Sequence, residues 1–340
     1  MKWSIGRFTT STLDLAHFPS DSIATTSFFQ WNAQSMKVIK LTYFTGAMTA
    51  LTKNISKECK ALQTLSLERC NLTMPIATIL NKTTTITELR LLSRTRSPYD
   101  KESSLLTRIR CLTVTKLALL DVIPQGLADT ILAAFPNAVD IEFSDIAPAV
   151  LQTLLDTDKF HTLRLLKIPY RSEGALVEAI GAQRREQLTS LVVTSSPFAA
   201  FQLPGAVLQR LLSACANLTS LTLRLGSNNF PDDILTVIAE QCNSRLQELR
   251  ISESPITPAA VTRLAERCPN LRVLSMGMDN LHDPYRSTAH EVGWDEAFYI
   301  LFSLCRQLER LRVHRLSVEQ VRGVIECVGA RSTALQVLSF

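Results

Sequence analysis

An apolar triplet recurs along nearly the whole chain, and its spacing constrains the fold more than any other feature of the sequence. In each copy an apolar residue is followed by others three and five positions later, as in Leu62, Leu65 and Leu67. The first residue of each triplet, here called the first anchor, is Thr10, Met36, Leu62, Ile86, Val114, Ala138, Leu163, Leu188, Leu218, Leu246, Leu271, Leu308 or Leu335. Thr10 is the weakest match. From Met36 onward the anchors recur every ~27 residues, a period that indicates stacked structural repeats.

Within a repeat the apolar pattern changes from that of a strand to that of a helix. In the segment 62–67, Leu65 and Leu67 alternate with polar residues, as in a short strand with one buried face. Between triplets the period is helical, and the spacing of 0, 3, 4 and 7 predicts four helices around 128–135, 208–215, 261–268 and 298–305. Thr257 and Pro258 provide a cap and a first-turn proline for the third of these. Each repeat is therefore expected to be strand, turn and helix.

These features predict an α/β fold, a leucine-rich-repeat solenoid of horseshoe shape with a parallel sheet on the concave side and helices on the convex side. We expect residues 1–35 to form an irregular N-terminal repeat or cap, and residues 36–340 to form one continuous domain. The chain stops on the anchor strand 335–340, which leaves the C-terminal repeat uncapped. Because an exposed strand edge is an association hazard, we expect a missing segment, a covering partner or a truncated gene model.

Eight cysteines are present, but their positions favour buried repeat residues over disulfides or a metal site. Five of them stand three residues before a first anchor and Cys242 stands four before; the five are Cys59, Cys111, Cys215, Cys268 and Cys305. A free cysteine behaves as a small buried hydrophobe. No CxxC pair occurs. We therefore predict no metal, no cofactor and reduced thiols.

The sequence predicts a chain without membrane spans that stays in the cytoplasm or the nucleus. No apolar run reaches the length of a transmembrane helix or of a secretory signal. The formal net charge of +5 is a mild basic excess. It permits an acidic partner, while nucleic-acid binding would call for a concentrated basic face, so nucleic acid is not the expected partner.

Residues 256–271 and the segments beginning at Cys59 and Cys215 resemble the cysteine-containing repeats of the F-box/LRR family, which read much like IT..(A)..LA..CPNL..L. Ribonuclease-inhibitor-like repeats are a looser relative. The resemblance implies a substrate-recognition role in an SCF-type ubiquitin ligase, with an F-box that docks a Skp-type adaptor. No F-box segment precedes the repeats in this sequence, so such an adaptor would need an F-box outside this chain.

Strand residues that alternate with the buried anchors are expected to line the concave face and to bind a protein ligand. In the late repeats these are Arg224, Arg250, Arg310, Arg312 and His314, and we predict them as the partner-binding site. Guanidinium groups pair bidentately with carboxylates or phosphates. The middle and early repeats place Asp140, Glu142, Lys40, Glu68, Glu88 and Arg90 at the same positions. A solvated polar face explains all of these residues equally well.

The sequence favours a binding protein without catalytic activity. It contains no GxSxG elbow, no Walker loop and no GxGxxG. A metal or hydrolase site would have to use His282, Asp283, His290 and Glu291, which lack HExxH spacing. Three long repeat connections, 93–104, 195–204 and 279–294, predict loops at one rim that either tune specificity or reflect length drift. The alternatives to a ligase subunit are a free-standing binding or inhibitor protein and the sensor fragment of a larger chain.

Overall fold

The computed structural model describes most of the chain as two compact units, Met1–Leu154 and Leu155–Phe340. The described residues are 11–16, 33–43, 48–70, 74–93, 105–123, 126–168, 173–183, 185–195, 205–224, 234–254, 256–278, 293–314, 321–322, 324–326 and 334–339. The connections 94–104, 196–204 and 279–292 lie outside them, so the rim loops and the residues His282, Asp283, His290 and Glu291 stay predictions.

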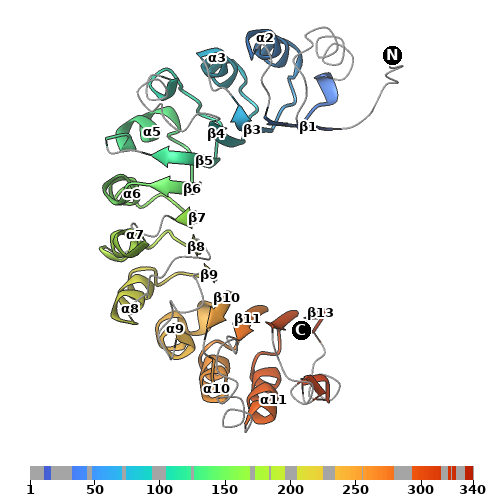
Figure 1. Ribbon diagram of the computed structural model, residues 1–340, viewed down its shortest axis with the longest axis vertical. Coiled ribbons are helices and arrows are strands. Elements are labelled where there is room, and N and C mark those ends of the chain that lie inside the picture. Colours follow the sequence, from blue (N-terminus) through green and yellow to red (C-terminus); the bar gives the residue numbers. More distant parts are fainter. Residues whose placement is uncertain are drawn as a thin grey trace. The chain divides into compact units, whose positions relative to one another are not determined.

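In the first unit the strands follow one another in sequence order, and each described pairing is parallel. The strands are β1 (Thr12–Ala16), β2 (Val38–Thr42), β3 (Thr64–Cys70), β4 (Glu88–Ser93), β5 (Lys116–Ile123) and β6 (Asp140–Ile146). The helices are η1 (Ala33–Ser35), α2 (Met48–Glu58), α3 (Met74–Lys82), α5 (Ala128–Ala134) and α6 (Pro148–Leu155). Figure 1 shows α2, α3 and α5 on one side of the strands.

The second unit repeats this arrangement, again with parallel strands in sequence order. Its strands are β7 (Thr162–Ile168), β8 (Ser190–Ser195), β9 (Ser220–Arg224), β10 (Glu248–Ser254), β11 (Val273–Met278), β12 (Arg310–His314) and β13 (Val337–Ser339). Its helices are α7 (Glu173–Gly181), α8 (Gly205–Ala214), α9 (Ile234–Cys242), η2 (Asn243–Arg245), α10 (Pro258–Arg267) and α11 (Trp294–Leu304). The helices α7 to α11 lie along one side of these strands (Figure 1).

The anchors form the core between strands and helices, as the repeat pattern predicts. Leu62, Leu65 and Leu67 are fully buried, and the corresponding residues of the late repeats, such as Leu271, Leu274 and Met276, are buried as well. Because parallel neighbouring strands place equivalent positions side by side, one repeat covers the leucines of the next. The predicted fold class, an α/β leucine-rich-repeat solenoid with a parallel sheet and flanking helices, is confirmed in these stacks.

One repeat has a different register from the one expected. Leu163 pairs with Leu191, the second anchor of the following repeat, and not with Leu188. The first anchor is therefore Phe160, which is buried, and Leu163 and Leu165 are the second and third. The assignment of Leu163 as a first anchor was wrong by three positions. The cause is a short repeat, since only 22 residues separate Ala138 from Phe160.

The helix starts and turns show why the CPNL pattern recurs. Thr257 caps α10 by accepting a hydrogen bond from the Ala260 amide at 3.2 Å, with Pro258 in the first turn. In three repeats, the asparagine immediately before the first anchor donates a hydrogen bond to the preceding repeat. The acceptor is the backbone carbonyl of the residue two positions before that repeat's first anchor. The three bonds are Asn137 to Leu112 at 2.7 Å, Asn217 to Glu186 at 2.8 Å and Asn270 to Ser244 at 2.8 Å. These asparagines tie each turn to the previous one.

The cysteines lie in the core as predicted. All seven that the structure describes are free and buried. Burial raises the pKa of Cys59, Cys215, Cys242, Cys268 and Cys305 to about 12, because the interior disfavours the thiolate. The Cys305 thiol donates to the Cys268 carbonyl of the repeat before it at 3.4 Å. These thiols therefore act as small core residues with a weak hydrogen-bond donor.

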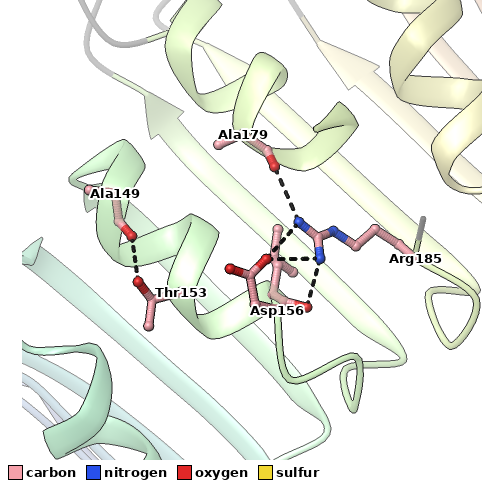
Figure 2. A network of polar contacts seen from close by, with 6 residues as sticks. Ala149, Thr153, Asp156, Ala179 and Arg185 are labelled. Atoms are coloured by element: carbon pink, nitrogen blue, oxygen red, sulfur yellow. Dashed lines mark hydrogen bonds and ion pairs between the residues drawn. The ribbon is translucent and has the colours of Figure 1, made fainter. Parts of the chain in front are cut away.

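Arg185 stands three residues before the anchor Leu188, the position that other repeats give to cysteine, and it is only 2% exposed. Figure 2 shows its guanidinium group directed toward Asp156 and toward the carbonyl of Ala179 on α7. It donates to the Leu155 carbonyl at 2.9 Å and to the Asp156 carboxylate at 3.3 Å. A cation at a helix C-terminus interacts favourably with its carbonyls. Arg185 thus joins the segment before β7, at Leu155 and Asp156, to the last turn of α7.

Candidate functional site

The face of each sheet that bears no helices, here called the open face, carries the strand residues that alternate with the buried anchors. In the second unit it presents Arg250 on β10 and Arg310 and Arg312 on β12, while Arg224 is exposed at the end of β9. The backbone of His314 pairs with Gly277 at the end of β12. The predicted arginines therefore do share one face of this unit.

The strand register places two of these arginines around a small residue. Arg250 pairs with Ser275, and Ser275 pairs with Arg312. Neighbouring strands are about 4.8 Å apart, so the two arginine backbones are about 10 Å apart with only a serine between them. Val273 separates Glu248 from Arg310 in the same way. Side chains as long as arginine can converge over Ser275 on one carboxylate or phosphate group.

The open face of the second unit has more cations than anions to balance them. Arg250 lies 3.6 Å from Glu248 on its own strand, and both side chains are about 40% exposed. Such an exposed pair is weak and screened by salt, so an incoming anion can compete for Arg250. Within the described part of the chain, no acidic side chain forms an ion pair with Arg224, Arg310 or Arg312.

Arg164 belongs to the same row, and the sequence pattern did not place it there. It pairs with Val192, which pairs with Thr222, which pairs with Arg250. The row thus runs from Arg164 to Arg312 with small or β-branched residues between the arginines. The shifted anchor assignment hid Arg164, because counting from Leu163 put Leu165 and Lys167 on the open face. The pattern Phe160, Leu163, Leu165 is the signal that would have found it.

The open face of the first unit carries an ion network around Arg90. Arg90 on β4 contacts Glu68 on β3 at 2.9 Å and Glu142 on β6 at 2.9 Å. It reaches across β5 because Ala118 occupies the intervening position in the row. These three charges already neutralise one another in large part. Glu68, Arg90 and Glu142 therefore hold each other, which leaves Arg90 less available to an incoming anion than Arg310 and Arg312 of the second unit.

A strained pair of residues lies at the ends of β2 and β3 in the first unit. Tyr43 and Arg69 both adopt left-handed backbone angles, with φ of 56° and 53°, although neither is glycine. The Arg69 guanidinium lies 4.8 Å from the centre of the Tyr43 ring, which is a cation–π geometry. The Tyr43 amide also donates to the Glu68 carbonyl at 2.9 Å. This contact offsets part of the backbone strain.

The helix side of the second unit has a hollow that is lined by described residues. It has a volume of about 580 Å³ between α7 and α8. It is lined by Gly181, Ala182, Gln183, Ala206, Gln209, Arg210, Ser213 and Ala214. Gly181 allows α7 to approach α8 closely, because an added Cβ would lie 3.1 Å from the Leu211 amide nitrogen. This lining offers no nucleophile with a neighbouring base, so the hollow does not suggest catalysis.

Metal and thiol chemistry find little support in the described ranges. No group of three or more His, Cys, Asp or Glu side chains there is placed to hold a metal ion. Thiolates are the reactive form of cysteine, and burial keeps the pKa of the thiols named above near 12. Of the helices that the structure describes, none combines the length and apolar character needed to span a bilayer.

Comparison with solved structures identifies the class of fold. One chain in the crystal structure of the Rad7 and Elc1 complex in yeast has 14% sequence identity to this protein. The two chains align over 97% of this chain and 81% of that chain, with a TM-score of 0.53. At this identity the similarity concerns the fold. The fold is therefore that of a leucine-rich-repeat solenoid.

Two further structures of repeat proteins are similar over most of this chain. The first is from the complex of Toll and Spatzle in Drosophila, with 16% identity, 90% coverage of this chain and a TM-score of 0.42. The second is from the TLR13–ssRNA13 complex, with 15% identity, 84% coverage and a TM-score of 0.47. This chain spans 41% and 40% of the lengths of those two chains. No protein-family model matches the sequence, and no curated protein matches it either.

Proposed function

We propose that this protein is a non-catalytic scaffold that holds another protein on the open face of its second unit. The observation that supports it best is the row in which Arg250 and Arg312 flank Ser275 with Arg310 beside them. Arg250 has only a weak exposed pair with Glu248, and no described acidic side chain pairs with Arg310 or Arg312, so this row favours a partner segment rich in carboxylates or phosphates. Arg164, Arg224 and His314 extend the proposed contact surface.

A finer proposal concerns the assembly in which the scaffold works. The cysteine-containing repeats resemble those of F-box/LRR proteins, which supports a role as the substrate-recognition part of an SCF-type ubiquitin ligase in the cytoplasm or nucleus. The yeast structure contains Rad7 together with Elc1. By analogy, an adaptor protein of the Skp type would hold this chain through a segment outside the described repeats. The alternative is a free-standing binding or inhibitor protein, or the sensor fragment of a longer chain.

The binding proposal is tested by reversing charge on the open face. Partners are captured with the wild-type protein from the source cell, identified, and then produced for titration. R250E/R312E is expected to weaken binding at least tenfold, because two cations facing the partner become anions. The matched control is R210E/R263E, which reverses two exposed arginines on the helices and should bind as the wild type does. Equal affinities for both double variants would overturn the proposal.

The ligase proposal has a separate test that does not depend on the arginines. The full-length gene product is purified with candidate Skp-type adaptors co-expressed. A stoichiometric complex supports the ligase subunit. A protein that binds its partner with no adaptor present in the complex supports the free-standing alternative, and the two outcomes are distinguished by mass measurement in solution.

A further inference from the structure

A short segment in the first unit, which runs from a turn at residue 108 to a bend at residue 112, presents charged and apolar side chains in a regular order. Residues 108–112 lead from the helical residues 105–106 to the anchor Val114. Ile109 and Cys111 point into the core and are buried, while Arg108, Arg110 and Leu112 alternate with them and are exposed. We call residues 108–112 the ledge. Because burial alternates along the ledge, its three exposed side chains share the side that faces away from the core.

The ledge is held rigidly by bonds to the repeats on both sides of it. Asn81 at the end of α3 uses both halves of its amide: its Nδ2 donates to the Arg108 carbonyl at 2.8 Å, and its Oδ1 accepts from the Arg110 amide at 2.7 Å. The Cys111 amide donates to the Ala134 carbonyl at 2.9 Å. Asn137 donates to the Leu112 carbonyl at 2.7 Å. These backbone groups are occupied, so a partner meets the side chains and not an open strand edge.

The exposed side of the ledge has an unusual composition for a turn between repeats. Leu112 is 63% exposed, more than any other large apolar side chain in the described residues. Lys82, next to Asn81, adds a third exposed cation. No described acidic residue pairs with Arg108, Arg110 or Lys82. The helix dipole accounts for Lys82 in the last turn of α3 and for Arg108, which follows the helical residues 105–106. Arg110 and Leu112, however, lie beyond both helix ends.

We propose that the ledge is a second docking site, which binds an extended acidic segment of a partner protein. Two carboxylates separated by one residue match the spacing of Arg108 and Arg110, and an apolar side chain two positions further covers Leu112. Charge complementarity selects this class of occupant. Because the ledge is fixed in advance, binding does not spend free energy on ordering its backbone. The site lies on the first unit and is independent of the arginines of the open face in the second unit.

A phage-displayed library of random heptapeptides tests this proposal without knowledge of the natural partner. The library is selected on immobilised wild-type protein and, in parallel, on R108E/R110E. We expect wild-type protein to enrich peptides with two acidic residues separated by one position and an apolar residue two positions beyond. The same pattern should be absent from selection on the variant. Enrichment of unrelated sequences, or of the same pattern on both proteins, would overturn the proposal.

A synthetic peptide from the selection then measures the contributions of individual residues. Its affinity should fall at least tenfold for R108Q/R110Q and severalfold for L112S, and it should stay unchanged for R250E/R312E. Asn81→Ala keeps both arginines but releases the ledge, so it should weaken the peptide and speed amide hydrogen exchange at residues 108–112. Thermal unfolding of each variant verifies that it is folded. An affinity unaffected by R108Q/R110Q in a folded protein contradicts the ledge as the binding site.

Discussion

The guanidinium of Arg185 and the carboxylate of Asp156 lie 3.3 Å apart, with the cation buried and the anion 42% exposed. Loss of the ion pair therefore costs more at Arg185 than at Asp156, because only the buried guanidinium has lost its contact with water. The carbonyls of Leu155 and Ala179 complete its contacts at 2.9 Å and 3.5 Å. This asymmetry predicts different costs for removing the two partners.

Removing the anion should destabilise the protein more than removing the cation. Asp156→Ala leaves a buried guanidinium with carbonyls alone, and we expect a loss of about 1–3 kcal/mol in the free energy of unfolding. Arg185→Met replaces the charge by an apolar side chain of similar length, and should cost about 1 kcal/mol or less. Urea unfolding followed by circular dichroism measures both. A larger loss for Arg185→Met than for Asp156→Ala would contradict this assignment.

The buried thiols predict that stability falls at alkaline pH. The pKa of Cys242 and Cys268 is raised from 9.0 to about 12 by burial. Above pH 9 the unfolded chain loses these protons while the folded chain keeps them, so the free energy of unfolding decreases as pH rises. The slope is up to about 1.4 kcal/mol per pH unit for each thiol. The window closes near pH 12.

Urea midpoints at pH 8 and pH 10 measure this effect. The wild type should lose more stability between the two values than the C242A/C268A variant, whose unfolded state has two fewer thiols to ionise. Comparing the two pH dependences, and not the absolute stabilities, removes the packing cost of the alanines. Identical losses in both proteins would show that these thiols are not protected by the core.

The turn asparagines should each contribute a similar amount to stability. Asn137→Ala and Asn270→Ala each remove one bond to the preceding repeat and leave a carbonyl that water can reach, so a loss of about 1 kcal/mol is expected for each. Because these two bonds share no residue and lie several repeats apart, the double variant should show the sum of the single losses. Asn217 is not equivalent, because its side-chain oxygen also accepts a bond from Arg245. Thermal or urea unfolding checks both values. A negligible loss in either single variant would mean that the bond does not hold the turn.

The small size of Ala118 should be essential for the ion network of the first unit. Ala118→Leu places a branched side chain between Arg90 and Glu142, which are 2.9 Å apart across β5. We expect the contact to break and the free energy of unfolding to fall by about 1–3 kcal/mol, because Glu142 is nearly buried. The control compares R90A with the double variant R90A/E142Q. Glu142→Gln should restore part of the stability lost in R90A, because it removes the unpaired charge. No rescue by E142Q would argue against a charge-based interaction.

The sequence predicted the repeat architecture because the anchors define it locally. Leu62, Leu65 and Leu67 have the same spacing as the late triplets, and a fixed spacing requires a fixed strand and turn. Thr257 and Pro258 likewise marked the start of α10 at the residue where it begins. Where a repeat is shortened, as before Phe160, the period fails and the register shifts by three positions, which concealed Arg164.

The candidate contacts were harder to predict than the anchors, because they depend on neighbours in other repeats. Arg185 occupies a core position that the pattern gives to cysteine, and only its bonds to Leu155 and Asp156 explain its burial. Arg90 on β4 reaches Glu142 on β6 because Ala118 on β5 lies between them. This contact depends on the residues of three neighbouring strands, which the pattern of a single repeat does not contain. The ledge arises from Asn81, a residue of the preceding repeat, holding the backbone of the next.

The central claim, that the open face of the second unit holds the partner, is tested most directly by site-specific photo-crosslinking. A photoreactive amino acid is placed at Ser275, between Arg250 and Arg312, and for comparison at Ser303 on the exposed side of α11. After illumination with the captured partner, the account predicts a crosslinked product from position 275 and none from position 303. A product from position 303 and none from position 275 would contradict it.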